Sequence, residues 1–309
     1  MKAPLQLPAK RGFTLIELLV AMAITTIIVT VLVSVTSVAL DTFNRSRSEL
    51  RASRQAKAMI DAMARDFESL VTRSGNKNEW LSAVNANPNN IGGKLKSTSA
   101  SKLIFFTAAT DRYSGEIGTD KDKGGDVSCV AYDLRYSDPI NTGGSRFDTF
   151  VLNRLIVNPD ETFANLLGKE KLTTAFQPYD ARLRDPSNFV CENIYQFTVT
   201  FNLQVPVVSG TTTTLFAVPV SVGQSANSGN VVQEFAIAGN QLNVSSGVTG
   251  YTAEQLKGAR VTAITIAATA ISDFGIDQLR TRTFSGNQQS DFLAKNSYQY
   301  SKTVQIPSR

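Results

Sequence analysis

Histidine, the side chain that most often carries acid–base chemistry near neutral pH, is absent from this chain of 309 residues. Its absence excludes a Ser-His-Asp triad, a Cys-His nucleophile pair, an H-E-x-x-H zinc site and any His-ligated haem or iron centre. The sequence also contains no Walker A pattern, no G-x-S-x-G elbow and no C-x-x-C pair. The residues therefore point to no catalytic site and no bound cofactor, and we expect a protein that is not an enzyme.

An acidic run within residues 110–127 has the residue types that could bind a metal ion. The segment beginning at Asp120 and Asp122, with Asp126 close behind, resembles the start of an EF-hand calcium loop. Position five is Gly124 and position twelve is Ala131, where that loop uses Asp or Asn and then Glu. Two interleaved lysines would also repel a cation. These departures favour a solvated hairpin loop, and a weak calcium site is the alternative.

Cys129 and Cys191 are the two cysteines of the chain, and both fall in segments that read as strands. Two buried free thiols or one disulfide would fit this placement equally. A disulfide would close a loop of about 62 residues and would contribute roughly 4 kcal/mol in the chain-entropy model.

Glu17 is a carboxylate inside an otherwise apolar run from Phe13 to Leu40. An acid at the centre of a membrane helix costs about 2.5–3.5 kcal/mol on insertion scales, and less near an end. Glu17 therefore lies at the membrane interface or has a partner.

The element that must position Glu17 is a membrane helix. Leu18–Leu40 contains no charge and would be roughly 35 Å long as a helix, enough to cross a hydrocarbon core about 30 Å thick. Residues 1–12 precede it with three basic residues and no acid. An ordinary secretory signal cleaved after Ala21-Met22-Ala23 is disfavoured, because the segment before it is short and interrupted by Glu17. An uncleaved anchor is the other alternative.

The run KRGFTLIELLV, from Lys10 to Val20, resembles the processing site of type IV prepilins and type II secretion pseudopilins. The resemblance implies that residues 1–12 are a leader, that a prepilin peptidase cuts between Gly12 and Phe13, and that Phe13 is N-methylated. It also implies that Glu17 pairs with the new amine of a neighbouring subunit. The implied location is the bacterial inner membrane, with a cytoplasmic N-terminus and a periplasmic head, and then a filament.

Five basic residues just beyond the span argue against this orientation under the positive-inside rule. They are Arg45, Arg47, Arg51, Arg54 and Lys57. The leader usually dominates, and only a cytoplasmic leader meets the peptidase, so we expect the N-terminus inside.

The helix is expected to continue to Ser74, so that 13–40 spans the membrane and 41–74 is amphipathic. Gly and Pro are absent from Arg45 to Arg73, Gly75 supplies a stop, and apolar residues recur at spacings of three and four. The predicted packing face consists of Ala56, Met59, Ile60, Met63, Ala64, Phe67, Leu70 and Val71. We expect this face to pack on a sheet.

Residues 75–309 read as a β-rich head, which makes the fold class α+β, with a long N-terminal helix on an antiparallel, pilin-like sheet. Residues 75–101 are expected to be loop. Predicted strands are Lys102–Thr107, Asp126–Tyr136, Phe150–Val157, Phe189–Val205, Ala259–Ile271 and Tyr298–Ile306, with a short helix over Ser272–Thr281. Strict alternation of apolar and polar residues from Tyr195 to Val205 predicts a half-buried antiparallel strand.

Residues 206–250 are dominated by Val, Ser, Thr, Gly and Asn, and read as an insertion. Phe216–Val222 and Val231–Ile237 would be two strands of one hairpin. The insertion is either a variable loop, which we favour, or a surface for a filament neighbour or target.

The order of elements resembles the larger minor pseudopilins of the J type, and the C-terminal fifty residues faintly resemble Verrucomicrobial cassette prepilin-like proteins. These resemblances imply a minor pilin or pseudopilin whose partners are prepilin peptidase, other pilin subunits and the inner membrane. An adhesive or DNA-uptake minor pilin is one alternative. A membrane-tethered periplasmic binding protein or enzyme is another.

The positive charge of the chain belongs mainly to its N-terminal part. The formal net charge is +5, but residues 75–309 hold 21 basic and 20 acidic residues. A nearly neutral head lacks the electrostatic footprint of a nucleic-acid-binding protein, so no nucleic-acid partner is expected.

Overall fold

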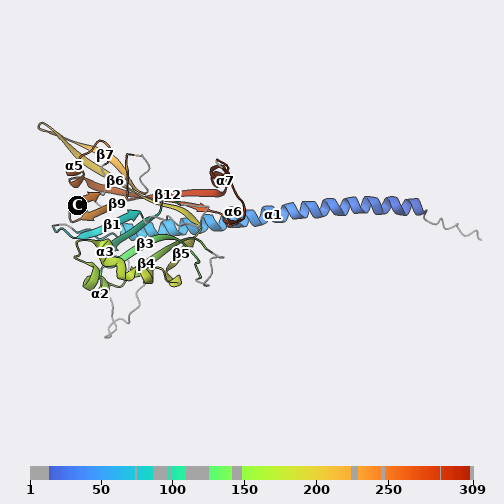
Figure 1. Ribbon diagram of the computed structural model, residues 1–309, viewed down its shortest axis with the longest axis horizontal. Helices are drawn as coiled ribbons and strands as arrows, with labels where there is room; N and C mark the ends of the chain where they lie inside the picture. The colour runs from blue at the N-terminus through green and yellow to red at the C-terminus, as the bar shows by residue number, and fades with distance from the viewer. Residues whose placement is uncertain are drawn as a thin grey trace, which may run out of the picture. The chain divides into compact units, whose positions relative to one another are not determined.

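The computed structural model describes the chain in several stretches (Figure 1). They are residues 14–73, 75–85, 97, 99–108, 125–140, 148–223, 229–244, 248–285 and 287–306. The chain divides into two units, Met1–Ser48 and Glu49–Arg309.

The first element is the helix α1, Leu15–Glu68. It ends earlier than the predicted Ser74, because the following residues join a strand. Leu70 forms a bridge with Thr107, and the Val71 amide donates to the carbonyl of Phe106 at 2.9 Å. The Thr107 hydroxyl lies 3.0 Å from the carbonyl of Asp66, near the end of the helix. The placement of Leu70 and Val71 on the helical face was therefore wrong.

The larger sheet has seven antiparallel strands in the order β10-β9-β1-β2-β3-β4-β5. Its strands are β1 Glu79–Asn85, β2 Ser101–Thr107, β3 Ser128–Ser137, β4 Thr149–Val157, β5 Phe189–Glu192, β9 Glu234–Ala238 and β10 Gln241–Val244. The predicted strands at β2, β3 and β4 are confirmed to within two residues. The prediction of loop over 75–101 was wrong for β1, which lies in the middle of the sheet.

The smaller sheet has five strands in the order β12-β11-β6-β7-β8. Its strands are β6 Ile194–Ser209, β7 Thr212–Val222, β8 Val231–Val232, β11 Arg260–Ile271 and β12 Ser297–Gln305. The alternation predicted for β6 is confirmed, since every second residue from Phe197 to Val205 is buried. All pairings are antiparallel except the two-residue pairing of β8 with β7.

Asn193 divides the predicted strand Phe189–Val205 into β5 and β6, which belong to different sheets. Its φ of 62° is left-handed, a conformation that asparagine tolerates better than most residues. Its amide donates to Phe150 of β4, and its carbonyl accepts from Ile271 of β11. The chain therefore changes sheets at one residue whose backbone is bonded to both.

The hairpin predicted within 206–250 was also wrong. β7 pairs with β6 in the smaller sheet, whereas β9 pairs with β1 and β10 in the larger one. This segment therefore supplies strands to both sheets.

Short helices fill the connections. Between β4 and β5 lie α2 Pro159–Glu161, a π turn Thr162–Leu166, α3 Leu172–Phe176, a 3-10 turn Gln177–Tyr179, α4 Asp180–Leu183 and a 3-10 turn Pro186–Asn188. Farther along lie α5 Ala253–Lys257, α6 Asp273–Thr281 and α7 Gln288–Asn296. The predicted short helix at α6 and final strand at β12 are confirmed.

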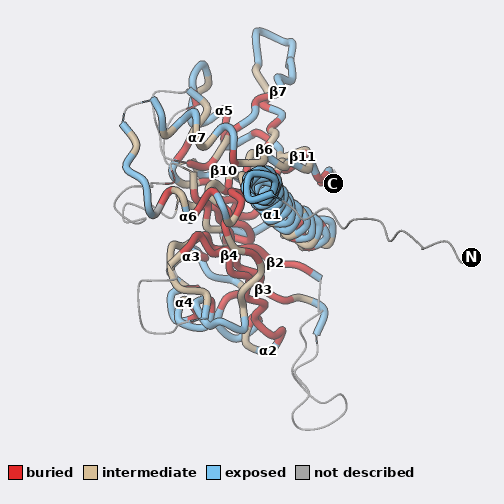
Figure 2. Tube along the Cα trace, turned by 90° about the vertical axis from the view of Figure 1, so that its right-hand side faces the viewer, coloured by how far each residue is buried: buried red, intermediate tan, exposed pale blue. Residues whose placement is uncertain are grey.

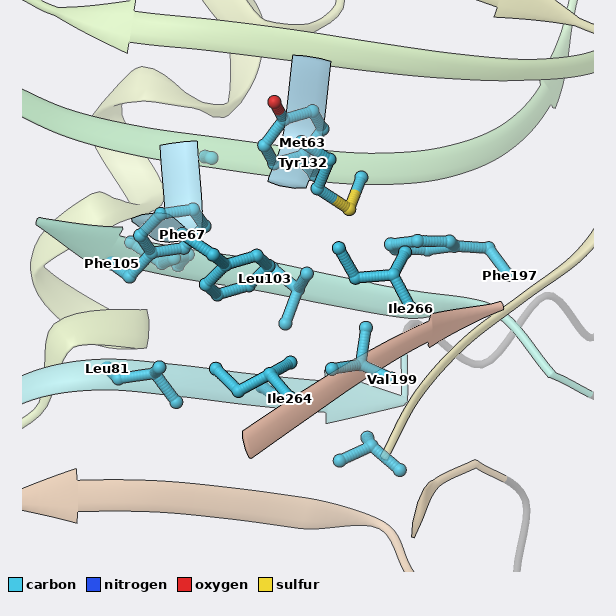
Figure 3. Packing of buried hydrophobic residues seen from close by; sticks show 14 of the residues in the cluster. Met63, Phe67, Leu81, Leu103, Phe105, Tyr132, Phe197, Val199, Ile264 and Ile266 are labelled. Atoms are coloured by element: carbon cyan, nitrogen blue, oxygen red, sulfur yellow. The ribbon is translucent and has the colours of Figure 1, made fainter. Parts of the chain in front are cut away.

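The core of the unit Glu49–Arg309 is built by the end of α1 and by both sheets (Figure 3). Phe67 of α1 stacks on Phe105 of β2 with ring centroids 4.3 Å apart. Ile266 of β11 and Val199 of β6 come from the smaller sheet. The predicted helical face is confirmed at Ala56, Met59, Ile60, Met63, Ala64 and Phe67, all of which are buried. Buried residues cluster on the strands in Figure 2.

The N-terminal helix as candidate functional site

Glu17 is bonded to the residue that begins the helix. The Thr14 amide and the Thr14 hydroxyl both donate to Oε2 of Glu17, each at 2.9 Å. In return, the Glu17 amide donates to the Thr14 hydroxyl at 3.3 Å. This reciprocal arrangement is a capping box, and it places a carboxylate at the positive end of the helix dipole. Glu17 thus has a partner within its own chain, while Gly12 and Phe13 lie outside the described residues.

The helix after Glu17 exposes apolar side chains all round. Between Leu15 and Phe43 the large apolar residues have exposed fractions from 52% at Val29 to 79% at Leu15. A helix that is apolar on every face is normally buried in a membrane or against other protein surfaces. By length and composition α1 contains a candidate membrane span, and its most apolar stretch of 18 residues is not buried in the structure.

Threonine hydroxyls interrupt this apolar surface, and each is bonded within the helix. Five of them donate to the carbonyl four residues earlier at 2.8 Å; they are Thr25, Thr26, Thr30, Thr36 and Thr42. Such back-bonding supplies the partner that a hydroxyl needs in hydrocarbon, where water is absent.

A buried ion pair fixes the other end of α1 in the head. Nη2 of Arg154, on β4, lies 2.6 Å from Oδ1 of Asp66, and its Nε lies 2.8 Å from Oδ2. The Tyr132 hydroxyl, on β3, donates to the same Oδ2 at 2.5 Å. The side chains of Asp66 and Arg154 are only 3% and 7% exposed. Burial and the nearby Asp66 carboxylate raise the pKa of Tyr132, which keeps it a hydrogen-bond donor.

Three other ion pairs of α1 are more accessible than this buried one. Arg51 contacts Glu192 at 2.5 Å and Asp273 at 3.6 Å, and Lys302 contacts Asp61 at 2.8 Å. Exposed pairs of this kind contribute little because water screens them. Of the ion pairs of α1, the one between Asp66 and Arg154 therefore contributes most to holding α1 on the larger sheet.

Sequence reasoning missed this pair, although a signal for it was present. Arg154 is a charge within the apolar run FVLNRLIV, just as Glu17 is a charge within its own apolar run. A charge in a buried strand demands a partner. Nothing in the sequence indicates that the partner lies 88 residues away on the helix.

The two cysteines are free and buried. Cys129 is opposite Val157 on β4, whereas Cys191 is opposite Leu152 of the same strand. They thus lie on either side of β4 and are offset by five residues, roughly 16 Å along the strand. A disulfide needs Cα atoms about 4.4–6.8 Å apart. Of the two alternatives left open by the sequence, the structure has free thiols.

The acidic loop falls mostly outside the described residues, which exclude Asp120 and Asp122. Asp126 is described and is exposed. Among the described residues no group of three His, Cys, Asp or Glu side chains could hold a metal ion.

The fold and the helix together define a class of protein. It is an α+β protein with a long N-terminal helix, apolar over its first half, followed by a head of two largely antiparallel sheets. The helix fits membrane anchoring.

Residues 7–33 match the family model described as the prokaryotic N-terminal methylation motif. The structure is similar to a type IV-like pilin from Thermus thermophilus, with 11% sequence identity, 83% of this chain and 97% of that chain covered, and a TM-score of 0.32. No curated protein matches the chain. The motif match confirms the prepilin-type N-terminus predicted from KRGFTLIELLV.

Proposed function

We propose that the protein is a minor pilin or pseudopilin, a structural and non-enzymatic subunit of a type II secretion pseudopilus or a type IV pilus. One observation carries the proposal. The first part of α1 is exposed and apolar on every side, has a carboxylate in its first turn, and lies largely within the prokaryotic N-terminal methylation motif of residues 7–33. A surface of this kind needs a membrane or other helices of the same kind around it.

Processing and location follow from the same motif. Prepilin peptidase cuts between Gly12 and Phe13 and methylates the new amine of Phe13. Before assembly the subunit sits in the bacterial inner membrane with its N-terminus cytoplasmic and its head periplasmic. It then leaves the membrane and packs its helix against those of other subunits. The large head suits a low-copy or tip-proximal position, because a large head packs poorly in a repeating filament.

The capping box uses only one of the two carboxylate oxygens of Glu17. Oε2 accepts both hydrogen bonds from Thr14, whereas Oε1 accepts none of the described ones. Oε1 can therefore accept from the Phe13 amine of a neighbouring subunit without uncapping its own helix. The neighbour's positive charge then offsets a carboxylate that is otherwise costly in an apolar surrounding.

Mass spectrometry of the mature N-terminus tests the first step. A chain that begins with methylated Phe13 is expected. A chain that begins at Met1 or near Ile24 would refute the prepilin assignment.

Two substitutions at Glu17 test its role in assembly. Glu17→Gln keeps an oxygen for Thr14 and removes the charge, whereas Glu17→Ala removes both. We expect both variants to be cleaved normally and to be poorly incorporated into filaments. Thr14→Ala, which loses the hydroxyl bonds of the capping box but keeps the charge of Glu17, is the matched control and should be incorporated better than either. Normal incorporation of Glu17→Gln would rule out the pairing of charges between subunits.

A further inference from the structure

A cavity of about 480 Å³ lies within the unit Glu49–Arg309. It opens where the chain that follows α1 meets the ends of both sheets. Arg73 comes from the segment after the helix, Asn240 from the β9–β10 turn, Arg260 from the start of β11 and Ile306 from the end of β12. Its size falls in the range of about 300–1,000 Å³ that is typical of small-molecule sites.

The floor of this cavity, which we call the Trp80 cavity, is apolar. Trp80, Ile237 and Leu242 line it and are 6%, 4% and 3% exposed. The indole N–H of Trp80 donates to the carbonyl of Gly239 at 2.8 Å, which fixes the ring. The Trp80 cavity therefore has a flat apolar surface held in place before any ligand arrives.

The wall of the Trp80 cavity carries positive charge. Arg73 and Arg260 line it, and the lining residues that the structure describes include no aspartate or glutamate. Within the part of the chain that the structure describes, neither arginine forms an ion pair. By contrast, the buried Arg154 and the half-exposed Arg182 each have a carboxylate partner.

The β9–β10 turn keeps the shape of one wall. Gly239 has a φ of 56°, and a Cβ there would lie 1.9 Å from the carbonyl oxygen of Asn76. Its amide donates to the carbonyl of Asn78 at 3.1 Å. A tight turn that only glycine can form thus presents Asn240, an amide side chain able to donate and accept, to the cavity.

We propose that the Trp80 cavity binds a carboxylate attached to a small apolar body. Guanidinium groups match a carboxylate by paired hydrogen bonds, and the indole with its aliphatic neighbours receives the apolar body. A free small acid and the carboxyl end of a peptide share this chemistry. The proposal is independent of the filament role, because it concerns the head alone.

The only tryptophan of the chain, Trp80, makes the test direct. The full chain in a non-ionic detergent is titrated with phenylacetate while tryptophan fluorescence is recorded. Phenylacetamide, which lacks the charge, and inorganic phosphate, which lacks the apolar body, are the control probes. A hexapeptide ending in a free Phe carboxylate is compared with its C-terminal amide, to separate the two sources of the ligand.

We expect a saturable change of fluorescence with phenylacetate and little change with either control probe. Arg73→Gln and Arg260→Gln should each weaken binding about tenfold or more, since each removes a charge-assisted contact. Arg184→Gln, an exposed arginine that does not line the cavity, is the matched control and should leave binding unchanged. A response to the free-acid peptide but not to its amide would extend the site to peptide ends, whereas a response to phenylacetate alone would restrict it to small acids.

Three results would overturn the proposal. One is that neither phenylacetate nor the free-acid peptide gives a saturable change of fluorescence. Another is an equal response to phenylacetamide or phosphate. The third is a loss of affinity in Arg184→Gln as large as that in Arg260→Gln. Because Arg260 is exposed, its substitution tests binding without threatening the fold.

Discussion

Removing the carboxylate of Asp66 is expected to destabilise the head strongly. In Asp66→Asn the guanidinium of Arg154 stays buried without a negative partner, since both side chains are at least nine-tenths buried. Breaking a buried ion pair from one side costs about 3–5 kcal/mol. For a domain of this size, roughly 2–4 °C of melting temperature correspond to 1 kcal/mol. The melting temperature should therefore fall by roughly 6–20 °C.

Thermal unfolding of the full chain in detergent, followed by circular dichroism, measures this loss. Asp61→Asn, which breaks the accessible pair with Lys302, is the matched control and should lower the melting temperature less. Replacing the whole cluster, as Asp66→Leu with Arg154→Met and Tyr132→Phe, should restore most of the stability, because no polar group is then left unpaired. If Asp66→Asn melts no lower than Asp61→Asn, the buried pair does not anchor the helix.

Three further predictions follow from other parts of the head. Burial raises the pKa of Glu79 above its ordinary 4.5, so the folded state holds this proton more tightly than the unfolded state does. The contribution of Glu79 to the free energy of unfolding is therefore greatest below about pH 4.5 and is lost as the pH rises through the pKa of the folded state. In denaturant titrations at pH 4 to 7, Glu79→Gln should make the free energy of unfolding decline less with pH than it does in the unsubstituted protein. Gly239→Ala should lower the melting temperature more than Gly210→Ala, because both glycines have positive φ but only at Gly239 would a Cβ meet a backbone oxygen. Burial raises the pKa of Cys191 to about 12 and that of Cys129 further, so both thiols should resist alkylation in the folded protein. After unfolding without reductant, a thiol titration should find two groups, and a count of zero would show a disulfide.

Strong local periodicity made part of the fold predictable. The apolar face of α1 from Ala56 to Phe67 and the alternation of β6 follow from spacing alone, because each pattern fits only one kind of element. Charges that interrupt apolar runs were equally informative. Glu17 indicated a site in this way, and the match of residues 7–33 agrees with that interpretation.

Pairing between distant segments was not predictable. β7 and β9 are close in sequence and read as one hairpin, yet they lie in different sheets because β9 pairs with β1. Propensity cannot indicate which partner a strand will find. β1 itself was missed because its seven residues stand in a segment rich in Asn, Gly and Ser.

Thr14 was a partner that the sequence did offer. The pattern Thr-x-x-Glu at the start of an apolar helix is the signature of a capping box. The partner predicted for Glu17 was the amine of a neighbouring subunit, whereas the structure shows a partner three residues away in the same chain.

The threonine hydroxyls of α1 have a consequence for how the helix changes its surroundings. Each of the five threonine hydroxyls from Thr25 to Thr42 is already bonded to a carbonyl of its own helix. Moving such a helix from lipid into a bundle of similar helices therefore neither breaks nor requires a hydrogen bond at these five threonines. The free-energy difference between the two surroundings then depends on packing shape and on the charge at the first turn. For the filament subunit proposed above, these threonines therefore add no hydrogen-bond cost either to extraction from the membrane or to return into it.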